Sequence, residues 1–249
     1  MRSVERIGIV VQARLGSSRL PRKALIEVSG KPLLQRLCDR MRLCRHADDL
    51  VVATSNQLQD QAIEEACGAW GVHVCRGPEK DLTSRLLGVA RTRGWSSLVR
   101  VTGDNPLTDP NGIDEMIDAF RESGAATAIV HNAHRKGYPY GTGAEIASRT
   151  LLETCDRELE SPDDREGFMA FARQRAERFK CIKLDAPTRL LRPDYFLTVD
   201  YLEDLTLQKE IFAHFGGRHD MRLEEIIEFL DANPELPRIN SHLHQQFSE

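Results

Sequence analysis

A short segment of the sequence, residues 12–23, holds the kinds of residue that binding a polyphosphate requires. It contains one glycine, two serines and four cations. Glycine lets backbone N–H groups approach a ligand closely, and arginine presents forked donors that match phosphate oxygens. The apolar, β-branched residues 7–11 come directly before this segment and predict a buried strand. A strand that leads into such a loop is typical of triphosphate sites, and a solvated basic loop is the alternative.

Known phosphate-binding fingerprints do not describe this loop. The Walker pattern would need glycine at Leu25 and serine or threonine at Pro32. No G-x-G-x-x-G follows the predicted strand either, which argues against an NAD-dependent oxidoreductase.

Asp104 is a second candidate, in the segment VRVTGDNPLTDP at residues 99–110. Residues 98–102 predict a buried strand, so Asp104 would lie at the edge of a sheet, where a carboxylate can hold Mg²⁺. The alternative is that Asp104 only begins a turn. Asp109 is expected to cap the helix that starts at Pro110.

The elements that must position these residues alternate along the first half of the chain. Such alternation predicts an α/β fold with a parallel sheet and right-handed crossovers, whose ligands bind at the carboxyl ends of the strands. The loop and Asp104 would meet at that edge. Strands are expected over residues 7–11, 49–54, 72–75 and 98–102, and helices over residues 32–45, 57–70 and 80–93.

The pattern becomes less regular after residue 125. The Gly/Tyr/Pro-rich residues 131–148 predict a long functional loop. Ser161 and Asp163 are plausible helix caps, and a polar tail from residue 233 is expected to be loosely held. Further strands are expected over residues 126–130, 179–184 and 195–200, and helices over residues 151–158, 165–178 and 224–230.

The length of 249 residues suits one α/β domain over residues 1–249 or a main domain with a subdomain. The formal net charge is −4 and the pI is near 6.1. No basic field suggests a nucleic acid partner, and no segment suits a membrane span or signal peptide. Six cysteines without a C-x-x-C pattern favour reduced thiols in the cytoplasm. The histidine pairs 131/134 and 242/244 lack the partners of a zinc site.

The opening segment, QARLGSSRLPRKAL followed by GKP, resembles the cytidylyltransferases of the spore-coat polysaccharide biosynthesis protein F type, which are related to CMP-sugar-acid synthetases. The resemblance implies a Rossmann-like, GT-A-like nucleotidyltransferase fold with a mainly parallel central sheet. It also implies a small acceptor-binding and dimerisation insertion at about residues 131–185, and a homodimer.

The same resemblance assigns roles to individual residues. Arg14, Lys23 and Asp104 would be catalytic, and Asp104 and Asp200 would bind the metal. An exposed helix position is the alternative for Arg85, and a helix cap for Asp200; Asp204 is expected to be structural. The implied nucleotide-binding residues are Gln12, Ala13, Arg14, Gly16, Ser17, Arg19, Lys23, Arg76, Gly77, Arg85 and Gly103.

The implied acceptor site departs from the family pattern. Relatives read Y-P-D-G-x-D-V-E where this chain has Tyr140 and Gly143 in place of the two acidic residues. Gly167 replaces a histidine that relatives carry after the pair Arg165 and Glu166. Both departures concern the identity of the acceptor. The implied acceptor-binding residues are Tyr138, Tyr140, Gly141, Glu145 and Arg165.

We therefore expect Mg²⁺-dependent transfer of CMP from CTP to a small acidic acceptor, with release of pyrophosphate. The acceptor would be a sugar acid, a phosphonate or another carboxylated molecule, and no residue stands out as a general base. A glycosyltransferase that uses a nucleotide-sugar is one alternative. A catalytically inactive nucleotide-binding protein is the other.

Overall fold

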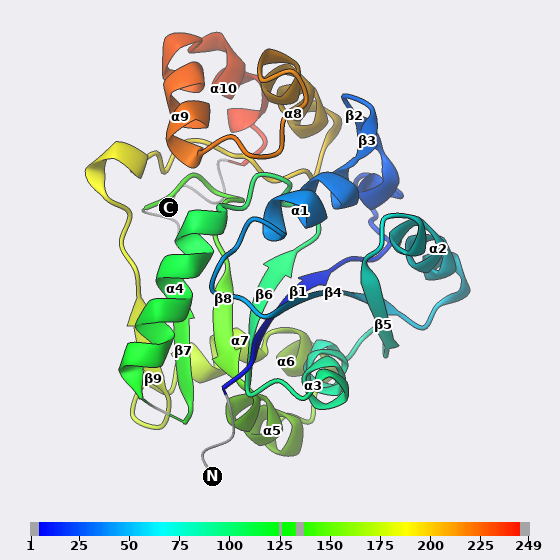
Figure 1. Ribbon diagram of the computed structural model, residues 1–249, viewed down its shortest axis with the longest axis vertical. Coiled ribbons are helices and arrows are strands. Elements are labelled where there is room, and N and C mark those ends of the chain that lie inside the picture. The colour runs from blue at the N-terminus through cyan, green and yellow to red at the C-terminus, as the bar shows by residue number, and fades with distance from the viewer. Residues whose placement is uncertain (1–4, 125, 133–136, 245–249) are drawn as a thin grey trace.

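A mainly parallel sheet forms the centre of the computed structural model, which describes residues 5–124, 126–132 and 137–244 (Figure 1). Within these residues seven strands lie in the order β5-β4-β1-β6-β8-β7-β9, and only β8 is antiparallel to its neighbours. The fold class expected from the sequence is confirmed. The strands are β1 (Ile7–Gln12), β4 (Asp49–Ser55), β5 (His73–Gly77), β6 (Ser97–Thr102), β7 (Ala128–His131), β8 (Glu145–Ser148) and β9 (Lys180–Lys183).

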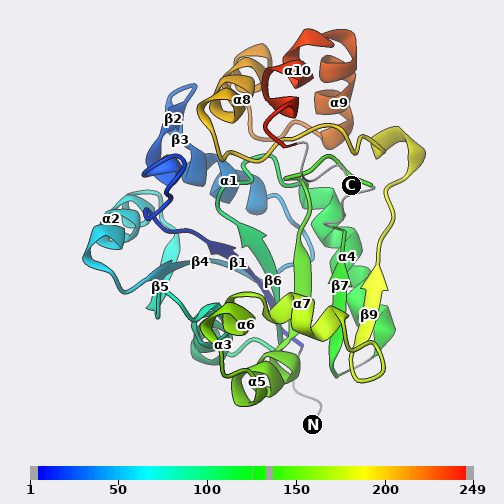
Figure 2. The same ribbon diagram turned by 180° about the vertical axis from the view of Figure 1, so that it is seen from behind.

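Helices cover both faces of the sheet because its strands are apolar on both sides. In β1, Ile7 and Ile9 pack with one set of helices and Val10 packs with the other. α4 lies in front of the sheet in Figure 1, and α6 and α7 lie in front in Figure 2. One face carries α1 (Leu33–Met41), α2 (Gln61–Ala69) and α4 (Pro110–Ser123); the other carries α3 (Leu82–Arg93), α5 (Arg149–Glu158), α6 (Pro162–Glu166) and α7 (Phe168–Arg173).

A third apolar cluster covers the carboxyl end of the sheet. It joins the C-terminal helices to Leu20 and Leu107, which lie in the loops after β1 and β6. Figure 1 shows the C-terminal helices α8, α9 and α10 together at the upper end of the view. The elements at this end are the hairpin β2 (Glu27–Val28) and β3 (Lys31–Pro32), with α8 (Leu202–His214), α9 (Leu223–Ala232) and α10 (Glu235–Ser241).

Several boundaries differ from the sequence predictions. The strand expected over residues 195–200 is wrong: this segment is extended but makes a single bridge, Tyr140 with Phe196, outside the sheet. The helix expected over residues 165–178 is two helices interrupted at Gly167. The tail from residue 233 is not loosely held up to residue 244, because it contains α10 and the fully buried His244. Three 3-10 turns complete the described structure: Lys23–Leu25, Leu58–Asp60 and Thr188–Leu190.

Residues 131–185, the segment expected to be an acceptor-binding and dimerisation insertion, contribute regular elements in their described portion. The segment supplies β8 and β9 to the central sheet and α5, α6 and α7 to one face. The expected loop at residues 131–148 therefore ends in a strand, and residues 133–136 of it, with His134, lie outside the described residues. Among the described helices, none is both long and apolar enough to span a membrane.

Gly8 gives a direct test of packing behind the central strand. A methyl group there would lie 2.2 Å from the indole of Trp95, which is fully buried. We expect Gly8→Ala to lower the free energy of unfolding by about 3 kcal/mol through overpacking. The melting temperature would fall by roughly 6–12 °C in thermal unfolding followed by circular dichroism.

Gly88→Ala is the matched control for Gly8→Ala. Gly88 lies inside α3, and a methyl group there would meet nothing within 4 Å. This substitution should raise stability by about 0.5–1 kcal/mol because alanine favours a helix. Equal melting temperatures for Gly8→Ala and the wild type would contradict the close packing of Trp95 against Gly8.

Candidate active site

The loop after β1 is folded back on itself. The backbone N–H of Arg22 donates to the carbonyl of Leu15 at 3.2 Å, and Arg22 adopts a left-handed conformation with φ of 58°. The N–H of Leu15 donates to the Asp60 carboxylate at 2.7 Å, and Asp60 is fully buried before α2. Sequence reasoning missed Asp60, because the predicted helix over residues 57–70 included it, whereas α2 begins at Gln61. The loop is thus held in shape without a ligand.

The loops after β1 and β6 meet at Gly103. Its N–H donates to the carbonyl of Gln12 at 2.8 Å. A Cβ at this position would lie 2.8 Å from that oxygen and 2.9 Å from the Cβ of Ala13. Glycine is therefore required because two backbones approach each other. The strand order reverses between β1 and β6, and open α/β sheets bind ligands at the carboxyl ends of the strands at such a point.

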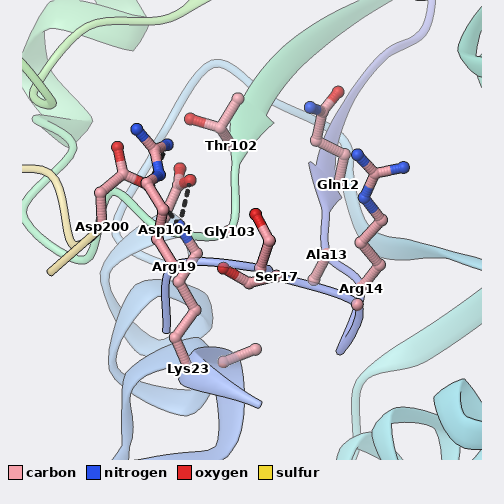
Figure 3. Close-up of a pocket in the computed structure, with 13 residues that line it drawn as sticks. Gln12, Ala13, Arg14, Ser17, Arg19, Lys23, Thr102, Gly103, Asp104 and Asp200 are labelled. Carbon is pink, nitrogen blue, oxygen red and sulfur yellow. Dashed lines mark hydrogen bonds and ion pairs between the residues drawn. The ribbon is translucent and has the colours of Figure 1, made fainter. Parts of the chain in front are cut away.

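Lys23 joins the two carboxylates that were expected to bind metal. Its ammonium donates to Asp104 at 2.8 Å, to Asp200 at 2.7 Å and to the carbonyl of Val199 at 2.7 Å. Arg19 also contacts Asp200, at 2.8 Å. Figure 3 shows Lys23 and Arg19 reaching toward both carboxylates, while Arg14 extends away from them beside Gln12.

Charge, rather than burial, sets the protonation state of Lys23. Burial alone would lower the pKa of the ammonium, but Asp104 and Asp200 outweigh it and hold the pKa above its usual value. The side chain is 13% exposed. Lys23 is therefore a permanent cation at neutral pH.

The pocket around these residues has a volume of about 270 Å³. It gathers the sequence-predicted residues from both loops, together with Ser18, Ala24 and Thr102, which were not predicted. The predicted residues in its lining are Gln12, Ala13, Arg14, Gly16, Ser17, Arg19, Lys23, Gly103, Asp104 and Asp200.

The oxygen atoms that this pocket offers as ligands suit a magnesium ion. The Lys23 ammonium marks a point within 2.8 Å of two carboxylates and one carbonyl, all of them hard oxygen ligands. Within the described residues no group of three or more His, Cys, Asp or Glu side chains could hold a metal. Two carboxylates suffice for Mg²⁺, which usually takes its other ligands from phosphates and water.

Asp204 holds the segment that carries Asp200. Its carboxylate accepts from the N–H groups of Asp200 at 2.7 Å and Tyr201 at 2.8 Å. It also contacts Asn240 and His244, each at 2.8 Å, from the C-terminal segment. The structural role predicted for Asp204 is confirmed. Asp200 does not cap α8, since its side chain contacts Lys23 and Arg19 instead.

A second pocket, of about 300 Å³, adjoins the first at Thr102, which lines both. Four of the five residues expected to bind the acceptor line it: Tyr138, Tyr140, Gly141 and Glu145. Tyr138 is buried, and burial together with Glu115 and Asp109 raises its pKa to about 12, so it is a neutral hydroxyl.

Arg100 is the charged residue of this second pocket that sequence reasoning missed. It lies in β6, donates from Nε to the amide oxygen of Gln12 at 2.8 Å, and donates from Nη1 to Glu145 at 2.5 Å. Glu145 is also paired with Arg173 of α7. The signal was available, because Arg100 is a charged residue between the apolar residues Val99 and Val101 of a strand.

Four predicted site residues lie outside both pockets. Arg165 binds Asp81 at 2.8 Å and also Asp156, and so joins α6 to α3 and α5 rather than facing the acceptor pocket. Arg85 donates to the carbonyls of Pro78 and Glu79. A Cβ at Gly77 would lie 3.0 Å from the Arg85 side chain, which leaves little room for a larger residue. Arg76 donates to the carbonyls of Ser55 and Gln57 and pairs with Glu64.

Comparisons with known proteins agree with this geometry. Residues 8–236 match the family model described as cytidylyltransferase. The spore coat polysaccharide biosynthesis protein SpsF of Bacillus subtilis is 33% identical over 91% of this chain and 94% of its own. A cytidylyltransferase structure from Leptospira borgpetersenii has a TM-score of 0.87 at 30% identity, covering 93% of this chain and 96% of that one. CMP:2-keto-3-deoxy-manno-octonic acid synthetase complexed with CTP shares the fold, with a TM-score of 0.64 at 20% identity over 85% of this chain and 100% of that one.

The fold is that of a nucleotidyltransferase. More specifically, the chain belongs to the cytidylyltransferase family. This membership favours transfer of a cytidylyl group over the glycosyltransferase alternative.

Asp204→Asn tests how Asp200 is positioned. Burial alone would raise the pKa of Asp204, but its hydrogen bonds with His244, Asn240 and two backbone N–H groups outweigh burial and hold the pKa below its usual value. The variant should lose about 3 kcal/mol of unfolding free energy in urea titrations at pH 7.

The pH dependence of that loss has a definite sign. Because the folded pKa is the lower one, the stabilisation is present above the unfolded pKa of about 4 and disappears as pH falls through the folded value. The difference between wild type and Asp204→Asn should therefore shrink below pH 4. Asp220→Asn, an exposed carboxylate paired with Arg218, is the control and should change little. A pH-independent difference would contradict the assignment.

Proposed function

We propose that this protein transfers CMP from CTP to an acidic sugar and releases pyrophosphate, and that Mg²⁺ is required. The observation that carries the proposal is the convergence of Lys23, Asp104 and Asp200 on one point at the ends of β1 and β6, in a chain of the cytidylyltransferase family. The intact cluster also argues against the inactive nucleotide-binding protein.

Cytidylyl transfer depends mainly on how the reacting groups are positioned and on the charges placed around the phosphates. An oxygen of the acceptor attacks the α-phosphorus of CTP, and the bond from that phosphorus to the bridging oxygen breaks as pyrophosphate leaves. Negative charge grows on the phosphate oxygens, so preorganised cations lower the barrier. Arg14, Arg19 and Lys23 supply three cations in the pocket.

Asp104 and Asp200 are the residues that would hold Mg²⁺. When bound, the ion would neutralise the triphosphate and align its α-phosphate with the acceptor. Lys23 keeps the two carboxylates together in the protein alone, and we infer that its ammonium turns to the triphosphate once the ion takes its place.

The second pocket is the proposed acceptor site. It adjoins the first at Thr102, so an acceptor in it would lie next to a nucleotide. An acidic sugar as the acceptor is supported by the names of two similar proteins, one a spore coat polysaccharide biosynthesis protein and the other a synthetase for the CMP derivative of 2-keto-3-deoxy-manno-octonic acid. A homodimer and a cytoplasmic location stay predictions, which sedimentation equilibrium and cell fractionation would test.

Asp104→Asn tests the proposed reaction. The substitution keeps the shape but removes a charge from the metal site, so we expect pyrophosphate release from CTP to fall on the order of 10²–10³-fold. Circular dichroism should be unchanged. More than about a tenth of wild-type activity would exclude Asp104 as an essential ligand, and a nucleoside diphosphate product would favour the glycosyltransferase.

Lys23→Ala tests the metal site without relying on turnover. Removing the ammonium leaves two carboxylates facing each other, so Mg²⁺ alone should raise the melting temperature of the variant more than that of the wild type. The further rise given by CTP with Mg²⁺ should be lost. Lys23→Ala combined with Asp104→Asn is the control and should not respond to Mg²⁺. If Mg²⁺ raised the melting temperatures of Lys23→Ala and the wild type equally, the ion would not bind at the position of the Lys23 ammonium.

A further inference from the structure

We propose that His244 is a positioning residue for the reaction. Its imidazole holds Asp204, and Asp204 holds the backbone of Asp200, one of the two carboxylates that would bind Mg²⁺. The segment of residues 240–244 would then serve the active site although it lines neither pocket. This inference rests on the proposed function, because a metal ion at Asp200 is part of that function.

The segment that carries Asp200 has no strand ladder to fix it. Residues 195–200 are extended but make a single bridge among the described residues, outside the central sheet. Their position depends instead on separate hydrogen bonds, such as that from the N–H of Val199 to the carbonyl of Asp104 at 2.8 Å. The N–H of Asp200 has the Asp204 carboxylate as its acceptor. A displacement of Asp204 would therefore move the residue that is proposed to hold the ion.

The two oxygens of the Asp204 carboxylate face different parts of the chain. Oδ2 accepts from the N–H groups of Asp200 and Tyr201, whereas Oδ1 lies 2.8 Å from both Asn240 Nδ2 and His244 Nε2. Asp204, Asn240 and His244 are all fully buried. Burial alone would raise the pKa of Asp204, but the hydrogen bonds outweigh it and keep the pKa low, so the carboxylate is ionised. An ionised carboxylate can only accept, and Nε2 of His244 therefore carries the proton.

Aromatic residues on both sides of Asp200 hold the imidazole of His244. Phe196 stacks on it with the ring centroids 4.8 Å apart and the planes 13° apart. Tyr201 meets it edge on, with the centroids 5.9 Å apart. These contacts orient the ring, so its N–H points at Asp204 before any ligand arrives. Groups that orient metal ligands from behind typically account for roughly 10- to 100-fold in metal affinity or activity.

Two substitutions separate the hydrogen bond from the packing. His244→Phe keeps a flat ring beside Phe196 and Tyr201 but removes the donor to Asp204. His244→Gln loses the ring but has an amide N–H about as far along the side chain as Nε2. If His244 positions Asp200, His244→Phe should weaken the binding that depends on the metal, and His244→Gln should recover part of the loss.

The measurement is calorimetric titration with CTP, once in Mg²⁺ and once in EDTA. In His244→Phe we expect the Kd for CTP with Mg²⁺ to rise about 10-fold, while the Kd in EDTA changes less than about threefold. With Mg²⁺, His244→Gln should bind CTP at least about threefold more tightly than His244→Phe does. Circular dichroism and the melting temperature would show that each variant is folded.

His214→Phe is the matched control. His214 is the last residue of α8 and stacks on Phe229 with the ring centroids 3.9 Å apart. It lies in the same group of C-terminal helices but lines neither pocket. This substitution also removes a histidine stacked on a phenylalanine, so both Kd values should stay those of the wild type.

The outcomes distinguish this inference from the proposed function. Equal rises of the two Kd values in His244→Phe, or no rise in either, would overturn the inference and leave cytidylyl transfer standing. Affinities that follow the melting temperatures of the two variants, rather than the presence of the donor, would also overturn it. No binding of CTP to the wild type, with or without Mg²⁺, would overturn the proposed function itself.

Discussion

The contact on which the structure depends most is the ammonium of Lys23 between two carboxylates. Asp104 and Asp200 approach the same point, and two like charges at that separation repel unless a cation lies between them. The three residues come from the first loop, the middle of the chain and its C-terminal third. Their meeting joins the segment that leads into the C-terminal helices to the loops after β1 and β6, so the same contact assembles the site and helps to hold the molecule together.

Two buried arginines of α1 support that arrangement from behind. Arg36 donates to the carbonyls of Val28, Ser29 and Gly217, and Arg40 donates to those of His219 and Met221. Burial lowers the pKa of Arg40 to about 10, which still leaves it charged at neutral pH. Backbone carbonyls thus compensate the charges and tie the loop between α8 and α9 to the central layer. The C-terminal helices are held at one end by these carbonyls and at the other by Asp204.

The elements predicted best from the sequence are the strands in which consecutive residues are apolar, together with the helices that connect them. β1, β4 and β6 are near-continuous apolar runs, so they and the helices between them were predicted to within a few residues. β8 was missed because Glu145–Ser148 is short and becomes buried only through β6 and β7 on either side. The segment before Asp200 alternates like a strand, but its N–H groups bond to Tyr140 and Asp104 instead of a neighbouring strand. Lys23 and Asp104 could be found from their loops, whereas the partners of Arg100 and Arg165 depend on contacts between distant residues.

A single strand sets the spacing between the two proposed substrates. Arg100 and Thr102 are two residues apart in β6, so their side chains leave the same face of the sheet, and Asp104 follows where the strand ends. Alternate residues of a strand are about 7 Å apart. The second pocket is lined by Arg100 and Thr102, and the first pocket by Thr102 and Asp104. The backbone of β6 therefore sets the distance between the two pockets, and a rigid strand rather than a loop would hold the proposed acceptor and nucleotide beside each other.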